Sequence, residues 1–281
     1  MISPIIGWYF KQRVKELRAN IERSLENQNI LFGELTEKLA LTEYGQKFGI
    51  DKLTTYQEFA ERVPVASFED FLPYIERNQR GEQSLLWPGD IRWFAKSSGT
   101  TNDKSKFIPI TEESLSYNHF QASKDVLSMY YNFNPESDLL TGKGLLIGGS
   151  HQINPLNEEA MYGDLSAVLF QNTPIWANWI RTPDLTVALM DEWETKIEAI
   201  AQQTLYDDVT SMSGVPTWTL VLLKRILEIT GKKNIQEVWP NIELYLHGGV
   251  SFTPYKEQFN KIIGKPIHYL NMYNASEGFF A

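Results

Sequence analysis

The sequence predicts an α/β fold in which helices flank a largely parallel sheet, with a helical segment at the N-terminus. Short apolar runs alternate with helical patterns from residue 91 to residue 270. Three of these runs end in glycine turns, at Gly148-Gly149, Ser213-Gly214 and Gly248-Gly249. Alternating strands and helices are typical of a parallel sheet, and such sheets bind ligands at the carboxyl ends of their strands.

Residues 1–80 are expected to form a helical segment that packs on the main domain. Apolar residues recur there at helical spacing with charged residues between them: Trp8, Val14, Leu17, Ile21, Leu25, Leu31, Leu35 and Leu39. This spacing predicts amphipathic helices.

Residues 81–281 are expected to form a single α/β domain. Its first strands are predicted over 91–95 and 107–110, because both runs are rich in β-branched and aromatic residues. A helix is predicted to start at Thr111-Glu112-Glu113, where two acids stand in the first turn.

Four further strands and two helices are predicted in the second half of the chain. Pro216 favours a helix start because proline suits the first helical position. The predicted strands cover 145–147, 209–212, 244–246 and 267–270, and the predicted helices 216–229 and 254–263.

Charge and composition narrow the class of protein. A formal net charge of −9 and a pI near 5.1 argue against a broad surface for nucleic acid or for an anionic membrane. The sequence has no cysteine, which excludes a thiolate nucleophile, a zinc-thiolate cluster and disulfides. The apolar run Ile2 to Phe10 has no basic residues ahead of it and fits neither a signal peptide nor a membrane span. We therefore expect a cytoplasmic enzyme.

The most informative segment is the loop between the first two predicted strands. It reads Ser97-Ser98-Gly99-Thr100-Thr101-Asn102-Asp103-Lys104-Ser105-Lys106. Hydroxyls, a glycine that lets backbone N–H groups approach a ligand, and a lysine ammonium suit polyphosphate oxygens. It is not a Walker loop, since no Gly-Lys pair of the chain is followed by serine or threonine.

Two later segments have the chemistry to complete a nucleotide site. Gly248-Gly249 leaves a wall without side chains, along which a flat ring could lie. Tyr273 offers an aromatic face for a purine, Ser276 a hydroxyl for a phosphate, and Glu277 a carboxylate for Mg²⁺.

The histidines are assigned to packing rather than to catalysis. His119 lies on an apolar helical stripe and is expected to be buried. His247 adjoins the glycine pair and is expected to be a neighbour of the site rather than a reactant. No two of the four histidines have metal-ligand spacing.

Together the three segments resemble the adenylate-forming superfamily, and within it the Gretchen Hagen (auxin-conjugating) acyl-acid amido synthetases. The likeness rests on the Ser97-Ser98-Gly99-Thr100 opening, on a lysine nine residues after the first serine, on Ser276-Glu277-Gly278, and on Ser213-Gly214-Val215-Pro216 with Trp218. It extends over essentially the whole chain. The chain resembles the N-terminal domain of such an enzyme, incomplete and without the small C-terminal domain.

The resemblance implies ATP and Mg²⁺ as cofactors and a role for each site residue. Lys106 and Glu277 would be the catalytic residues, with Glu277 as the metal ligand. The phosphate cradle would be Ser97, Ser98, Gly99, Thr100, Thr101 and Lys106. Gly248, Gly249 and Tyr273 would flank the adenine, and Ser276 would contact the α-phosphate.

The implied reaction is carboxylate activation to an acyl-adenylate with release of pyrophosphate, followed by transfer to an amine such as an amino acid. The expected partners are thus a small carboxylic acid and an amine, with no nucleic acid and no membrane. Two alternatives stay open: a thioester-forming ligase of the acyl-CoA type, and a nucleotide-binding module without turnover. Asn102-Asp103 stands where the family loops usually carry glycine, which favours the second alternative.

Overall fold

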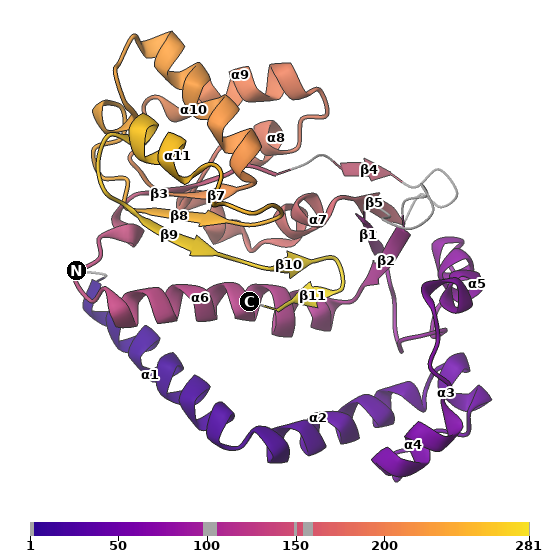
Figure 1. Ribbon diagram of the computed structural model, residues 1–281. Helices are drawn as coiled ribbons and strands as arrows, with labels where there is room; N and C mark the ends of the chain where they lie inside the picture. Colours follow the sequence, from indigo (N-terminus) through magenta and orange to yellow (C-terminus); the bar gives the residue numbers. More distant parts are fainter. Residues whose placement is uncertain (1–2, 98–105, 149–150, 154–159, 281) are drawn as a thin grey trace. The chain divides into compact units, whose positions relative to one another are not determined.

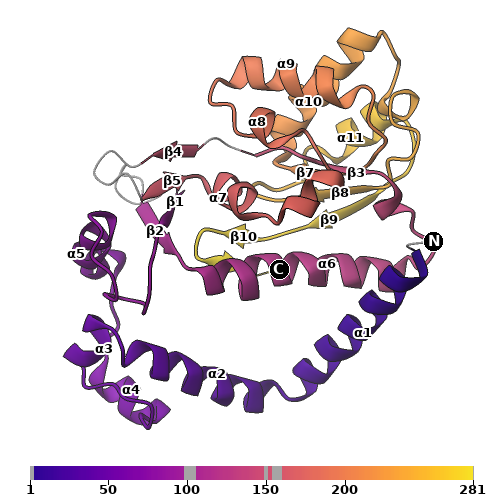
Figure 2. The same ribbon diagram turned by 180° about the vertical axis from the view of Figure 1, so that it is seen from behind.

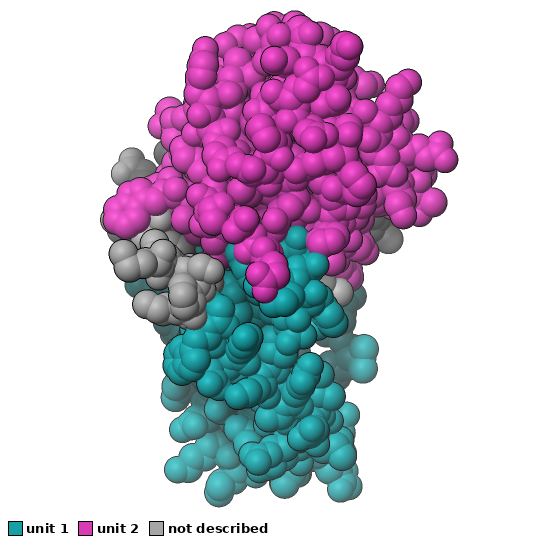
Figure 3. Space-filling view, turned by 90° about the vertical axis from the view of Figure 1, so that its left-hand side faces the viewer, with its two compact units in different colours: residues 1–135, 153–162 teal, residues 136–152, 163–281 magenta. Residues whose placement is uncertain are grey.

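The computed structural model describes residues 3–97, 106–148, 151–153 and 160–280 (Figure 1). The chain divides into two compact units, coloured separately in Figure 3. Unit 1 comprises Met1–Pro135 and Ile153–Tyr162, and unit 2 comprises Glu136–Gln152 and Gly163–Ala281. The division into a helical segment over 1–80 and an α/β domain over 81–281 stays a prediction.

Unit 1 begins with helices, as the spacing of its apolar residues predicts. They are α1 (Ser3–Glu22), α2 (Ser24–Leu39), α3 (Glu43–Lys47), α4 (Tyr56–Arg62) and α5 (Phe68–Gln79). Capping boxes begin two of them, with Thr55 and Glu58 at α4 and Ser67 and Asp70 at α5. Each box satisfies backbone N–H groups that the first helical turn would leave unpaired.

The apolar stripe of α1 is only partly buried. Phe10 and Val14 are buried, because α1 packs on α6 (Phe120–Phe133). The rings of Phe10 and Tyr131 stack there at 4.9 Å. Beyond this contact Ile21 near the end of α1 is 74% exposed, and Leu25 in the first turn of α2 is 81% exposed. Trp8, near the start of α1, is 63% exposed. The helical periodicity is thus confirmed, and only part of the apolar stripe is buried.

An ion pair accompanies the contact between α1 and α6. The Arg13 guanidinium donates to both carboxylate oxygens of Asp125, at 2.6 and 2.9 Å. This bidentate geometry is the strong form of an arginine–carboxylate pair. It raises the pKa of Arg13 above its ordinary value.

The first two strands form an antiparallel hairpin. β1 (Trp93–Ser97) pairs with β2 (Lys106–Ile110), in a four-stranded sheet of order β2-β1-β5-β4. Here β4 is His151–Ile153 and β5 is Met161–Gly163. The helix predicted to follow β2 begins at Glu112, passes through a π-helical stretch, η1 (Ser114–His119), and continues as α6. His119 is fully buried, as predicted.

Unit 2 contains the parallel sheet. Its order is β6-β3-β7-β8-β9, and every neighbouring pair is parallel. The strands are β6 (Arg181–Thr182), β3 (Lys143–Leu146), β7 (Val209–Gly214), β8 (Leu244–His247) and β9 (His268–Asn271). The predicted largely parallel sheet is therefore confirmed.

Helices connect these strands, and α9 (Trp193–Thr204), α10 (Pro216–Thr230) and α11 (Lys256–Ile263) lie on one face of the sheet in both Figure 1 and Figure 2. Pro216 takes the first turn of α10, and Gly231 ends that helix with a φ of 66°. The remaining elements of unit 2 are η2 (Leu139–Thr141), α7 (Leu165–Asn172), η3 (Ile175–Trp179), α8 (Leu185–Ala188), η4 (Ile235–Glu237), β10 (Asn274–Ala275) and β11 (Gly278–Phe279).

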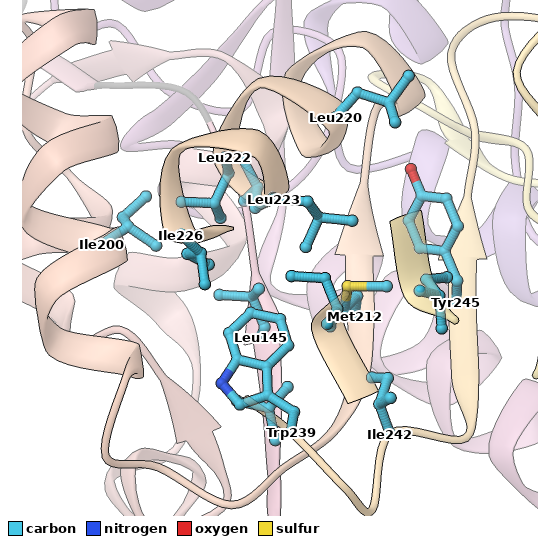
Figure 4. Packing of buried hydrophobic residues seen from close by; sticks show 14 of the residues in the cluster. Leu145, Ile200, Met212, Leu220, Leu222, Leu223, Ile226, Trp239, Ile242 and Tyr245 are labelled. Atoms are coloured by element: carbon cyan, nitrogen blue, oxygen red, sulfur yellow. The ribbon is translucent and has the colours of Figure 1, made fainter. Parts of the chain in front are cut away.

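The core of unit 2 lies between the sheet and these helices (Figure 4). Leu145, Met212 and Tyr245 project from neighbouring strands, and Leu222 and Ile226 project from α10 to meet them. All five side chains are fully buried. The indole of Trp239 keeps a hydrogen bond inside this core: its Nε1–H donates to the Thr204 carbonyl at 3.0 Å.

We expect Leu222→Ala to lower the free energy of unfolding of unit 2 by about 2–5 kcal/mol, because the substitution leaves a cavity in a dense core. Urea titration followed by tryptophan fluorescence measures this change. Val221→Ala is the matched control, since Val221 is the preceding residue on the same helix and is 48% exposed. Its effect should stay within about 0.5 kcal/mol. Equal losses in the two variants would contradict the core described above.

Candidate nucleotide-binding site

The carboxyl ends of the central parallel strands are aligned by their register. Gly214 of β7 is the partner of His247 of β8, and His247 is the partner of Asn271 of β9. The segments that follow these residues therefore leave the sheet at the same edge. This is the edge at which open parallel sheets bind ligands.

Two of the three predicted segments are in direct contact at this edge. The Met272 N–H donates to the His247 carbonyl at 2.7 Å, immediately beyond the last strand pair. A Cβ atom on Gly248 would lie 2.4 Å from the Met272 carbonyl oxygen, so only glycine fits there. Gly249 has a φ of +80°, in the left-handed region that favours glycine. Both predicted glycines are thus required by the local backbone.

Residues 273–280 form a short hairpin that the sequence did not indicate. β10 and β11 are antiparallel, with Ala275 opposite Gly278, so Ser276 and Glu277 are the two residues of the turn. The Phe280 N–H donates to the Tyr273 carbonyl at 2.9 Å and closes the hairpin at its base. The turn therefore presents a hydroxyl and a carboxylate side by side.

The side chains of this hairpin are available to a ligand. Tyr273 is 60% exposed, and its ring lies 5.3 Å from the ring of Phe280. Glu277 is exposed, and its carboxylate makes no ion pair with any residue that the structure describes. Exposed and unpaired, it is a hard oxygen donor of the kind that Mg²⁺ prefers.

A metal held by protein side chains alone finds no support in the described part of the chain. No group of three or more histidine, aspartate or glutamate side chains is arranged to hold an ion there. A cation at Glu277 would take its other oxygen ligands from phosphates and water, which is how Mg²⁺ is usually held beside a nucleotide.

The third predicted segment, the hydroxyl-rich loop, is described only at its two ends. Ser97 and Lys106 are direct partners and form the last pair of the β1–β2 hairpin, so the loop connects the two strands at that end. Ser98, Gly99, Thr100 and Thr101 lie outside the described residues, as do Asn102 and Asp103.

The Lys106 ammonium has an aromatic neighbour and no acidic one among the described residues. Its Nζ lies 4.9 Å from the centroid of the Phe68 ring, and no carboxylate of the described chain pairs with it. Lys106 belongs to unit 1, whereas Gly248, Tyr273 and Glu277 belong to unit 2. That all three segments meet on one nucleotide stays a prediction.

His247, which the sequence analysis assigns to packing beside the glycine pair, is a buried ring. It is 5% exposed, and its ring stacks on Phe252 at 4.1 Å. Nδ1 is buried without a hydrogen-bond partner among the described residues. Burial lowers the pKa of the imidazole below its ordinary value, so the ring is neutral at pH 7. The signal in the sequence was a histidine that ends an apolar strand directly before a glycine pair.

None of the helices described here is both long enough and apolar enough to cross a lipid bilayer.

Comparisons with known proteins identify the family. Residues 13–267 match the family model described as the GH3 family N-terminal domain. Among curated proteins, "Indole-3-acetic acid-amido synthetase GH3.8" of Oryza sativa subsp. indica is 33% identical over 103 residues, which are 36% of this chain and 16% of that protein. "Jasmonoyl--L-amino acid synthetase JAR4" of Nicotiana attenuata is 32% identical over 122 residues, which are 42% and 20% of the two chains.

A solved structure shares the fold. The chain superposes on "AtGH3.15 acyl acid amido synthetase in complex with 2,4-DB" with a TM-score of 0.78 at 17% identity, over 95% of this chain and 55% of that one. The chain thus spans about half the length of this structural neighbour, and its matches cover a fifth or less of the two curated relatives. Because the family model covers most of the sequence, the chain belongs to the GH3 family and carries that family's N-terminal domain.

Proposed function

We propose that the full-length protein uses ATP to activate a small carboxylic acid as an acyl-adenylate and then transfers the acyl group to an amine, an amino acid in the first instance. The observation that carries this proposal is the contact of Gly248 with Met272, which sets the glycine pair beside the Tyr273–Glu277 hairpin at the ligand-binding edge of a parallel sheet. The relatives support it, since they are named as synthetases that join indole-3-acetic acid or jasmonate to amino acids.

In the first step, a carboxylate oxygen of the acid attacks the α-phosphorus of ATP. The P–O bond to the β-phosphate breaks, and pyrophosphate leaves with the electron pair. In the second step, the amine nitrogen attacks the acyl carbon, loses a proton and displaces AMP. Neither step needs a nucleophile from the protein, which agrees with a chain that has no cysteine.

The work of the chain is to align the reactants and to offset charge. Lys106 would stabilise the negative charge that develops on the leaving pyrophosphate, together with backbone N–H groups of the 97–106 loop. Gly248, Gly249 and Tyr273 would hold the adenine, and Ser276 would donate to an α-phosphate oxygen. Bound Mg²⁺ supplies further neutralisation of the phosphates, and Glu277 would be its protein ligand.

We also propose a cytoplasmic location and a site restricted to small molecules. The net charge of −9 argues against a broad basic surface for nucleic acid, and the lack of cysteine in the sequence agrees with a compartment in which disulfides are rare.

Replacing either charged residue should largely abolish the first step. In the full-length enzyme, Lys106→Ala and Glu277→Gln are each expected to reduce carboxylate-dependent ATP–pyrophosphate exchange by roughly 100-fold or more, because each removes charge stabilisation from the transition state.

One matched control comes from the same hairpin as Lys106, and the other from the same unit as Glu277. Lys96 pairs with Phe107, one step along the β1–β2 hairpin, so it lies on the opposite face of the hairpin from Lys106. Glu257 is an exposed carboxylate on α11. Lys96→Ala and Glu257→Gln should keep normal exchange. Unchanged exchange in both site variants would reject the assignment.

The product and the acceptor are tested separately. With ATP and a panel of aromatic and aliphatic acids, we expect the full-length protein to form AMP and pyrophosphate rather than ADP. Addition of amino acids should yield an amide, measured by mass spectrometry, in excess of the thioester formed with coenzyme A. A dominant thioester would assign the chain to the acyl-CoA type of ligase. ATP binding without any AMP would indicate a module without turnover.

A further inference from the structure

The glycine pair of the candidate site stands in a short turn whose two ends are joined by aromatic rings. His247 directly precedes Gly248, and Phe252 follows three residues after Gly249. The two rings stack with centroids 4.1 Å apart and an interplanar angle of 23°. The stack therefore closes the turn at its base, from one side of the glycine pair to the other.

The stack is anchored in the core of unit 2. Phe252 also lies 4.9 Å from the ring of Tyr269 and 5.3 Å from that of Phe259. His247 lies 5.5 Å from Tyr245, the fully buried ring of the same strand. The position of the turn is thus tied to side chains that are held by the sheet and by α11.

Within the described part of the chain, the imidazole of His247 is held by ring stacking and not by a hydrogen bond. Its Nδ1 is buried without a partner, which is a cost to stability that a phenyl ring would not have. The neutral ring, by contrast, gains the stacking energy that any planar aromatic would gain on Phe252.

The backbone of His247 links the turn to the neighbouring hairpin. Its carbonyl accepts the Met272 N–H at 2.7 Å, and the next residue, Gly248, lies against the Met272 carbonyl. Movement of His247 would therefore shift the glycine wall relative to Tyr273, the residue that follows Met272.

We propose that His247 is a positioning residue of the nucleotide site, whose stack on Phe252 holds the Gly248–Gly249 wall beside Tyr273 before the nucleotide arrives. This inference rests on the proposed function, because it assigns the ligand of that wall as the adenine of ATP. A wall that is already in place avoids the free-energy cost of ordering the turn when ATP binds. Loss of the stack should therefore lower the affinity for ATP more than it lowers the rate of the chemical step.

The test uses full-length variants and the KM for ATP in pyrophosphate exchange. His247→Ala, which removes the stack, should raise this KM about three- to tenfold and change kcat less than about twofold. His247→Phe keeps a planar ring on Phe252 and should restore the KM to within about twofold of the native value. Phe252→Ala should reproduce the effect of His247→Ala, and the double variant should add little more.

A second control separates positioning from a general loss of stability. Ile263 is fully buried in the same hydrophobic cluster and is the last residue of α11. Ile263→Ala should lower the melting temperature without raising the KM for ATP. The proposal is overturned if Ile263→Ala raises the KM as much as His247→Ala does. It is also overturned if His247→Phe is as impaired as His247→Ala, which would assign the role to the imidazole nitrogen.

Calorimetric titration with ATP distinguishes failure of this inference from failure of the proposed function. A protein that binds ATP but catalyses no exchange would lack the proposed activity, and the order of Kd values among the same variants would still decide the role of His247. A native protein that does not bind ATP would overturn both.

Discussion

The close approach of Gly248 to the Met272 carbonyl is the constraint on which the candidate site depends. It follows from the parallel pairing of β8 with β9, which ends at His247 and Asn271 and is extended by one more hydrogen bond from the Met272 N–H to the His247 carbonyl. A side chain at residue 248 would push these two backbones apart. Gly248 has no side chain, and this suits the wall to a flat ring. The same lack of a side chain allows the two segments to approach each other.

This constraint changes how the glycine pair is interpreted. A glycine at a strand end can serve a ligand, a tight turn or a close packing contact, and the sequence alone does not distinguish these reasons. Here Gly248 is needed for packing against Met272 and Gly249 for its positive φ. The backbone explains both residues without a nucleotide, so the case for a nucleotide depends on the conjunction of the pair with Tyr273, Ser276 and Glu277 and on the family match.

The parts of the fold that depend on local sequence could be predicted. Pro216 marks the start of α10, the apolar runs mark β7, β8 and β9, and their alternation with helices indicates parallel pairing. Features that depend on distant partners could not. The patterns of the strands over 91–95 and 107–110 do not show which further strands they pair with, so their separate sheet of order β2-β1-β5-β4 was not predicted. The spacing of Ile21 and Leu25 predicts a helix but does not reveal that these faces are exposed.

The same division applies to the site. Residue chemistry indicated which side chains suit a nucleotide, but Ser276-Glu277 lacks the glycine or Asn-Gly signal of a two-residue turn, so the hairpin that presents them was not foreseen. The role of His247 was not foreseen either. Its stack forms with Phe252, five residues further along. Between the two lies a turn whose conformation depends on Met272, in the segment that follows β9.

Charge provides a further argument for the proposed site. The chain is acidic overall, and several of its cations are already paired with carboxylates: Arg13 with Asp125, Lys38 with Glu113, Arg77 with Glu43, Lys143 with Asp207 and Arg225 with Glu198. A cation so paired contributes little field to a polyphosphate. Lys106 keeps its charge free of any described carboxylate and rests on the Phe68 ring, which attracts an ammonium without cancelling its charge. Glu277 in turn keeps a carboxylate free of any described cation. This pattern of charge suits a phosphate as the partner of Lys106 and a divalent cation as the partner of Glu277.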